Sequence, residues 1–150
     1  MYHESKNPRS HVYEARGAEW LYYFSHRCDC RGHKYLAKII KRINQFVFHV
    51  NIYPEVEIGA RLQLPHGGYG VVIHHDVVIG SDAIIFHNVT IANGGAEIGD
   101  RVYIGTGAVI IGDINIGDDV VIGANAVVYS DVPDRTMVVS PKAIYKEIEN

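Results

Sequence analysis

The sequence predicts a mainly β protein, in which short parallel strands coil into a solenoid after an N-terminal α-helical segment. Two features predict this architecture. Aliphatic residues recur every six positions from residue 52 onward, whereas the apolar residues before residue 50 follow helical intervals. We therefore expect an N-terminal tail and helical segment over residues 1–50, and a solenoid domain with a C-terminal extension over residues 51–150.

The N-terminal segment is expected to form a loose polar tail and then two helices. Two groups of apolar residues stand at helical spacing, and Gly32 between them is expected to separate the helices. The first group is Trp20, Leu21 and Phe24. The second group is Leu36, Ile39, Ile40, Ile43 and Val47, opposite Lys34, Lys38, Lys41 and Arg42. These apolar stripes must pack on the rest of the chain or on another subunit.

The solenoid is predicted from thirteen repeat units, each of which begins with Ile, Leu or Val. The first residues are Ile52, Ile58, Leu64, Ile73, Ile79, Ile85, Ile91, Ile98, Ile104, Ile110, Ile116, Ile122 and Val128. A six-residue unit fits one short strand and a corner, and three such units close one triangular coil. Thirteen units therefore predict about four coils.

The repeat is interrupted twice. Ile73 follows Leu64 by nine positions, and Ile98 follows Ile91 by seven positions. We expect both interruptions to be loops that leave the coil, and loops on a rigid scaffold often carry function.

The net charge of the chain changes sign near residue 50, where the six-residue repeat begins. Residues 1–50 carry a net charge of +5 and residues 51–150 a net charge of −8. The basic half could contact nucleic acid or anionic lipid, but no nucleic-acid-binding motif accompanies it, so a solvated helical face is the favoured interpretation. No secretory signal or membrane-spanning stretch is present in the sequence, which predicts a cytoplasmic protein.

The two cysteines, Cys28 and Cys30, stand among histidines in the segment HRCDCRGH. Zinc sites usually use wider pairs of cysteines, so we expect two reduced cysteines in a helical hairpin and no metal.

One wall of the predicted prism carries a column of outward-pointing residues. The units on this wall begin at Leu64, Ile85, Ile104 and Ile122. Their third residues are His66, His87, Thr106 and Ala124. A histidine can remove a proton from a hydroxyl group, and small residues above it leave a channel for an extended ligand. The column spans on the order of 15 Å, which is comparable with the pantetheine arm of coenzyme A.

Most of the nine histidines are expected to be solvated, including His3, His11, His26 and His33. A role for His74 and His75 is left open. His66 differs because it lies beside the first interruption, in the segment LPHGGYG, whose glycines let a ligand approach closely.

The segments LPHGGYGVVIHHDVVIG, IIFHNVTIA and RGHKYLAKIIKRIN resemble bacterial serine O-acetyltransferases and their short relatives in surface-polysaccharide gene clusters. The resemblance covers about residues 17–145. It implies a left-handed β-helix, acetyl transfer from acetyl-CoA to a hydroxyl of serine or of a sugar, and a homotrimer or a dimer of trimers with the site between adjacent solenoids.

The resemblance also implies roles for individual residues. His66 matches the general base, and Asn51 stands where an aspartate orients that histidine. We assign His87, above His66 in the column, to substrate binding. The residues expected to bind CoA are Ala92, Thr106, Ala124 and Lys142.

Three departures from serine acetyltransferases concern the acceptor and the base. An amide at Asn51 cannot stabilise an imidazolium by charge, Pro65 replaces an acidic residue, and the loop that carries a second histidine is missing between Ile91 and Ile98. Two alternatives stay open: a catalytically impaired scaffold, and a zinc-dependent carbonic anhydrase, which needs three converging histidines.

Overall fold

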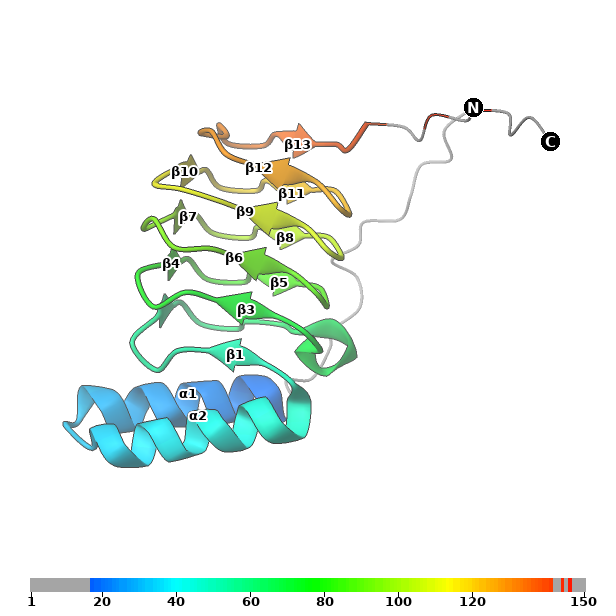
Figure 1. Cartoon of the computed structure of the whole chain (residues 1–150). Coiled ribbons are helices and arrows are strands. Elements are labelled where there is room, and N and C mark those ends of the chain that lie inside the picture. The colour runs from blue at the N-terminus through cyan, green and yellow to red at the C-terminus, as the bar shows by residue number, and fades with distance from the viewer. Residues whose placement is uncertain (1–16, 142–143, 145, 147–150) are drawn as a thin grey trace.

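The computed structural model describes residues 17–141, 144 and 146, and Figure 1 shows a coil of short strands standing on two helices. The helices are α1 (Ala18–Cys30) and α2 (Lys34–Phe48), as the apolar spacing predicts. Gly32 lies between them with a φ of 83°, a left-handed conformation that favours glycine. His49 ends α2 in the left-handed conformation and directs the chain into the first strand.

The coil consists of two-residue strands that pair in parallel. They are β1 (Asn51–Ile52), β2 (Glu57–Ile58), β3 (Val72–Ile73), β4 (Val78–Ile79), β5 (Ile84–Ile85), β6 (Thr90–Ile91), β7 (Glu97–Ile98), β8 (Tyr103–Ile104), β9 (Val109–Ile110), β10 (Asn115–Ile116), β11 (Val121–Ile122), β12 (Val127–Val128) and β13 (Met137–Val138). Each strand from β1 to β12 ends on a predicted aliphatic position, so the six-residue repeat is confirmed.

The strands form three walls. Wall A has the order β1-β3-β6-β9-β12, wall B has β10-β7-β4-β2, and wall C has β13-β11-β8-β5. Wall A is on the side nearest the viewer in Figure 1, and its strands point to the left as the coil climbs from the helices, so the coil is left-handed. The predicted fold class is confirmed.

The described coil continues beyond the last predicted repeat unit. A bridge joins Gln63 to Ile84 on wall C, and another joins Val132 to Ile116 on wall B, so each wall has five levels. The sequence repeat indicated about four coils because Val132 follows Val128 by only four positions, so a count of six misses the last turn.

The core of the coil is a stack of aliphatic side chains, one from each strand. On wall A, Ile73, Ile91 and Ile110 are fully buried and lie in register, because their strands pair residue for residue. Burying such side chains stabilises each one by about 1.5–3 kcal/mol relative to leaving it exposed.

The helices are fixed to the first coil by polar contacts from α1. The Tyr22 hydroxyl donates to the Val56 carbonyl oxygen at 2.7 Å, and the Leu64 amide donates to Glu19 Oε1 at 2.7 Å. Ala18 and Tyr22 also belong to the same buried cluster as the coil interior. The first level of the coil is therefore held from below by α1.

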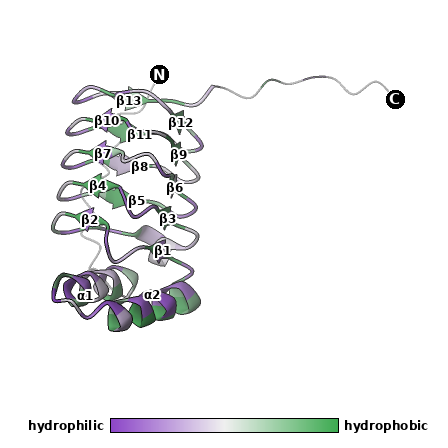
Figure 2. Cartoon of the chain, turned by 60° about the vertical axis from the view of Figure 1, so that its left-hand side comes forward, coloured by the Kyte–Doolittle hydropathy of each residue, from purple (hydrophilic) through white to green (hydrophobic). Residues whose placement is uncertain are grey.

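Only some of the apolar residues of the two helices are buried where the helices pack on each other and on the coil. Leu21 and Cys28 of α1 pack on Ala37 and Ile40 of α2. Figure 2 shows further hydrophobic residues along the side of α2 that is turned away from the coil. None of the helices in the described part of the chain is long and apolar enough to cross a membrane.

Candidate functional site

The first interruption of the repeat forms a tight turn between walls C and A, over Pro65–Gly68. His66 has a φ of 59° and Gly67 a φ of 71°, so two consecutive residues adopt the left-handed conformation. A Cβ at Gly68 would lie 3.0 Å from side-chain atoms of Leu64 and Val50, so the turn packs closely on the base of the coil. This geometry leaves the His66 side chain exposed.

The predicted column is present on this edge of the prism. Ile85 pairs with Ile104, and Ile104 pairs with Ile122, so the third residues of these units lie one above another. The imidazole rings of His66 and His87 are 5.1 Å apart between centroids and nearly perpendicular, at 88°. The structure therefore brings the two histidines together, as the repeat predicts.

Tyr69 is a member of this edge that the sequence analysis missed. The Asn88 amide donates to the Tyr69 carbonyl at 2.8 Å, and one level higher the Gly107 amide donates to the His87 carbonyl at 3.2 Å. The backbone of Tyr69 thus occupies the level below His87, while His66 reaches that level from the other end of the turn. A count of four positions back from Ile73 arrives at Tyr69, whereas a count forward from Leu64 arrives at His66. Tyr69 is 56% exposed, and the centroid of its ring lies 5.0 Å from that of the His49 ring.

Two buried polar atoms near the column have no hydrogen-bond partner among the described residues. They are Nδ1 of His87 and Oδ1 of Asn51. Asn51 opens β1, pairs with Val72, and follows Val50, the residue against which the His66 turn packs. Within the described part of the chain, no hydrogen bond joins Asn51 to His66. Because unpaired buried polar atoms are costly, both atoms are available to a ligand or to a rearranged side chain.

Above the histidines the column consists of smaller side chains. Thr106 is half-buried and Ala124 is exposed, and the Asn125 amide donates to the Thr106 carbonyl at 2.8 Å. The Ser140 hydroxyl donates to the Ala124 carbonyl at 2.7 Å, so the chain after β13 runs beside the top of the column. Lys142, the other residue predicted at this end, lies outside the described residues.

Ala92 is not on the same edge as His66 within one chain. It follows β6, at the far end of wall A, and its amide donates to the Ile110 carbonyl at 2.9 Å. His74 lies one level below it, because the His74 amide donates to the Ile91 carbonyl at 3.0 Å. The residues predicted to bind CoA therefore lie on two edges of the prism.

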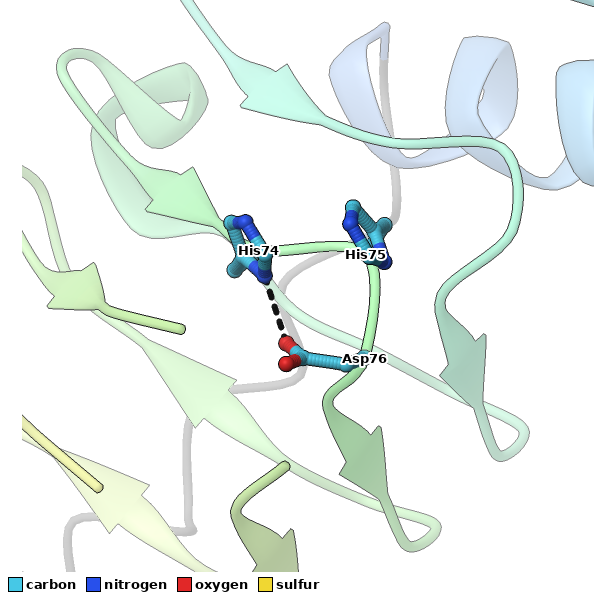
Figure 3. A group of neighbouring side chains, drawn as sticks. All are labelled: His74, His75 and Asp76. Carbon is cyan, nitrogen blue, oxygen red and sulfur yellow. Dashed lines mark hydrogen bonds and ion pairs between the residues drawn. The ribbon is translucent and has the colours of Figure 1, made fainter. Parts of the chain in front are cut away.

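The edge that carries Ala92 also holds a group of metal-ligating side chains. Ligand atoms of His74, His75 and Asp76 lie within 4.8 Å of one another. Figure 3 shows Asp76 directed at His74, with 2.6 Å between Oδ1 and Nδ1. The hydrogen bond with His74, with a second one from the Gly94 amide, lowers the pKa of the Asp76 carboxyl to about 2. This is the one group in the described ranges in which three such residues could hold a metal ion, and His66 and His87 are not part of it.

A cavity of about 460 Å³ opens at the base of this second edge, away from His66. Its lining residues are Lys38, Lys41, Arg42, Tyr53, Pro54, Glu55 and His75. The ammonium of Lys41 lies 3.8 Å from the centre of the Tyr53 ring, and desolvation is the main cause that lowers the Lys41 pKa. This cavity and the column are thus separate features, and the chemistry of the column depends on an exposed surface.

The two cysteines are free, as predicted. Cys28 is buried and Cys30 is exposed, with its sulfur 3.5 Å from Nε2 of His26.

Comparisons with known proteins agree with this architecture. The family described as "Bacterial transferase hexapeptide (six repeats)" matches residues 95–130. The chain is 37% identical over 135 residues to a serine acetyltransferase of Bacillus pumilus, covering 85% of this chain and 62% of the relative. It is 40% identical over 120 residues to the "Putative colanic acid biosynthesis acetyltransferase WcaB" of Escherichia coli, covering 76% of this chain and 74% of the relative.

Solved structures of serine acetyltransferases have a similar fold. Neisseria gonorrhoeae serine acetyltransferase in complex with serine matches with a TM-score of 0.77 and 37% identity, over 85% of this chain and 55% of that one. A serine acetyltransferase in complex with CoA matches with a TM-score of 0.76 and 31% identity, over 80% of this chain and 51% of that one. The chain therefore spans only about half to two thirds of the length of the serine acetyltransferases that it matches.

Proposed function

The chain belongs to the family of bacterial hexapeptide-repeat acetyltransferases, and on this basis we propose that it is an acetyl-CoA-dependent O-acetyltransferase. The observation that carries the proposal is the column on one edge of the prism. It places an exposed imidazole, His66, at the foot of a strip that becomes smooth at Thr106 and Ala124. Similarity to serine acetyltransferases, one of them solved with CoA, supports the choice of co-substrate.

In the proposed reaction, His66 acts as the general base. Its neutral imidazole takes the proton of the acceptor hydroxyl while that oxygen attacks the thioester carbonyl carbon of acetyl-CoA. The resulting tetrahedral oxyanion is stabilised by backbone N–H groups. The carbon–sulfur bond then breaks, and the imidazolium returns its proton to the sulfur, so that the products are an O-acetyl ester and free CoA.

The other site residues are proposed to position the reactants. Asn51 follows Val50, against which the His66 turn packs, and its Oδ1 has no partner among the described residues, so we assign it to accept a hydrogen bond from the imidazole. The buried Nδ1 of His87 lacks a partner among the described residues, and the His87 ring lies beside that of His66, which supports a role in holding the acceptor. Thr106 and Ala124 are proposed to line the pantetheine channel, with Lys142 near its nucleotide end.

We propose a hydroxyl of serine or of a sugar as the acceptor. The relatives named serine acetyltransferase support serine, and the similarity to WcaB supports a sugar. Pro65 is buried and offers no charged group, and only five residues connect β6 to β7. The groups that would hold the charged ends of serine are thus few, which favours testing sugars alongside serine.

The oligomer proposed for this function is a trimer, alone or as a dimer of trimers. Ala92 and His66 lie on different edges of one prism, so they can line one channel only if two copies each supply an edge. A trimer of parallel prisms satisfies this condition, and closed cyclic symmetry is common among homo-oligomers. We place the reaction in the cytoplasm, where acetyl-CoA is available.

The proposal is tested by measuring free thiol release from acetyl-CoA with the purified full chain. The acceptors are L-serine, amino sugars and nucleotide sugars, each compared with a reaction without acceptor. We expect release that depends on one acceptor class. Absence of acceptor-dependent release with all of them contradicts the proposed activity. CoA affinity, measured in parallel by calorimetry, then separates an impaired enzyme that binds CoA from a scaffold that does not.

A further inference from the structure

The two helices leave a broad apolar face uncovered at the base of the molecule. Its eight large side chains are each between 43% and 88% exposed. They are Trp20, Phe24, Tyr35, Leu36, Ile39, Ile43, Phe46 and Val47. We call this set the base face. A folded chain rarely exposes a contiguous apolar patch of this kind unless something binds to it.

Both helices contribute residues to the base face. On α2, Leu36, Ile39 and Ile43 follow helical intervals and form one stripe. On α1, the rings of Trp20 and Phe24 stack at 5.5 Å between centroids. Figures 1 and 2 show the two helices side by side beneath the coil, and the hydrophobic colour in Figure 2 lies on the side of α2 turned away from it.

The exposed charges on the two helices are mostly positive. Five cationic side chains on or between the helices are exposed: Arg27, Arg31, Lys34, Lys38 and Arg42. Of the two acidic residues of this segment, Glu19 is buried and bonded to the Leu64 amide, and Asp29 is only partly exposed. The part of the chain from residue 51 onward has a net charge of −8. The molecule is therefore positive at its base and negative along its coil.

The apolar base face and the positive charge around it together favour one kind of binding partner over the others. A second copy placed face to face would bring two positive rims together, which like-charge repulsion disfavours. An anionic surface attracts the base and repels the coil, so it orients the molecule before the apolar residues make contact. Trp, Tyr, Phe and Leu beside Lys and Arg are the residues of amphipathic helices that lie in a lipid interface.

We propose that the base face binds the surface of an anionic lipid bilayer, with α1 and α2 lying in the plane of the interface and the coil standing away from it. The acyl chains accept the apolar side chains of α2 and the stacked rings of α1. The lipid phosphates pair with the exposed cations, mainly through Arg42, which stands one turn from Ile39 and from Phe46, and through Lys38, one turn before Arg42. The proposal goes beyond acetyl transfer, and its test requires neither acetyl-CoA nor an acceptor.

The chain contains its own reporter for this contact. Trp20 is the only tryptophan of the sequence, and it lies in the base face with 62% of its surface exposed. Its emission moves to shorter wavelength when the indole leaves water. The experiment titrates the full chain with unilamellar vesicles made of equal parts of phosphatidylglycerol and phosphatidylcholine, and with vesicles of phosphatidylcholine alone. Vesicle flotation measures the bound fraction independently.

With anionic vesicles we expect a blue shift of Trp20 emission and flotation of the protein. The apparent affinity for phosphatidylcholine vesicles should be at least about tenfold weaker, since several cations each gain from the anionic surface. Raising the salt concentration from about 0.1 M to about 0.5 M should weaken the anionic binding, because exposed charges are screened.

Two pairs of variants test the two parts of the surface. Ile39→Ser with Phe46→Ser should weaken binding by at least about tenfold, because both apolar anchors are lost. Lys38→Glu with Arg42→Glu should remove the preference for anionic vesicles. The matched controls lie on the coil and should bind as the wild type does: Val127→Ser with Tyr129→Ser for exposed apolar residues, and Arg135→Glu for charge. Circular dichroism checks that every variant is folded.

Three results would overturn the proposal. The first is no binding to either type of vesicle, and the second is equal binding to both. The third is a Trp20 blue shift that grows with protein concentration in the absence of lipid and disappears in the Phe46→Ser variant. That third result would show that a second copy covers the base face.

Discussion

At the scale of single residues, the position of His66 depends on the backbone of one short turn. Two consecutive left-handed residues, His66 and Gly67, project the imidazole outward beside the ring of His87. Left-handed conformations are uncommon for residues other than glycine and cost about 1–3 kcal/mol where they occur. Close packing of Gly68 on Leu64 and Val50 holds the turn in this shape.

The role of His66 predicts a large loss of activity when it is removed. His66→Ala should lower kcat/KM by about 100- to 10,000-fold, because a positioned general base contributes on that order. Thiol release from acetyl-CoA measures the effect, and CoA affinity should change little. His33→Ala serves as the control, since His33 is an exposed histidine before α2, away from the column. Equal loss in both variants would contradict the assignment.

The amide at Asn51 predicts a gain from a carboxylate at the same place. Asn51→Asp should raise kcat severalfold, because a carboxylate stabilises the imidazolium that His66 becomes during the reaction. The same charge raises the pKa of the imidazole, so the acidic limb of the pH–rate profile should move to higher pH. Asn115→Asp is the matched control, because Asn115 opens β10 as Asn51 opens β1. An unchanged profile in Asn51→Asp would show that the two side chains do not interact.

The sequence predicts part of this site for a definite physical reason. Strands of a regular coil pair in register, so counting by six places His87, Thr106 and Ala124 above one another. The count of six fails at the turn that carries His66. Three additional residues in this turn place two residues, His66 and Tyr69, at the same level of the column. Side-chain packing decides what each contributes, and a repeat count contains no information about it.

At the scale of the elements, α1 carries much of the attachment between the helical segment and the coil. Tyr22 is almost fully buried, and its hydroxyl donates to a carbonyl of the first coil. Tyr23 donates to the Gly59 carbonyl at 2.5 Å and accepts from the Leu62 amide at 3.1 Å. The apolar spacing in the sequence predicts both helices. It does not predict these contacts, because a tyrosine in a helix can be placed on the apolar face or on the polar face.

Burial of Tyr22 predicts a dependence of stability on alkaline pH. Desolvation is the main cause that raises the pKa of the Tyr22 hydroxyl above its usual value near 10. The unfolded chain therefore loses this proton at a lower pH than the folded chain does. The stabilisation is fully present below pH 10 and is lost as the pH rises from there toward the folded pKa.

Tyr22→Phe separates this contribution from the rest of the chain. The variant should lower the free energy of unfolding by about 1–2 kcal/mol at neutral pH, because the Val56 carbonyl loses its donor. Its stability should also fall less steeply than that of the wild type above pH 10. Urea unfolding at pH 7 and at several values above pH 10 measures both effects. Parallel pH dependence in the two proteins would contradict this account of Tyr22.

At the scale of the whole molecule, the fold follows from the repeat, whereas the assembly does not. Inward aliphatic residues at a period of six leave few architectures other than a coil with three walls, and the observed walls have that register. The place of Ala92 depends on the assembly. The resemblance assigns it to the CoA channel, but it lies on a different edge from His66, and one sequence cannot indicate which edges of separate copies meet.

The division of site residues between two edges predicts an oligomer in solution. Light scattering after size-exclusion chromatography should give three times the chain mass of 16.7 kDa, or twice that value for a dimer of trimers. In the proposed trimer a second copy supplies the missing edge, so activity per chain should fall when dilution dissociates the assembly. An active monomer would contradict a site shared between copies.

A crystal structure of the full chain with bound CoA tests the central claim most directly. The account predicts that the pantetheine arm lies along the column past Thr106 and Ala124, with its sulfur within about 4 Å of the His66 imidazole. The opposite edge of the channel should come from a second copy and include Ala92. CoA bound elsewhere, for example in the cavity lined by Lys38 and His75, would contradict the account.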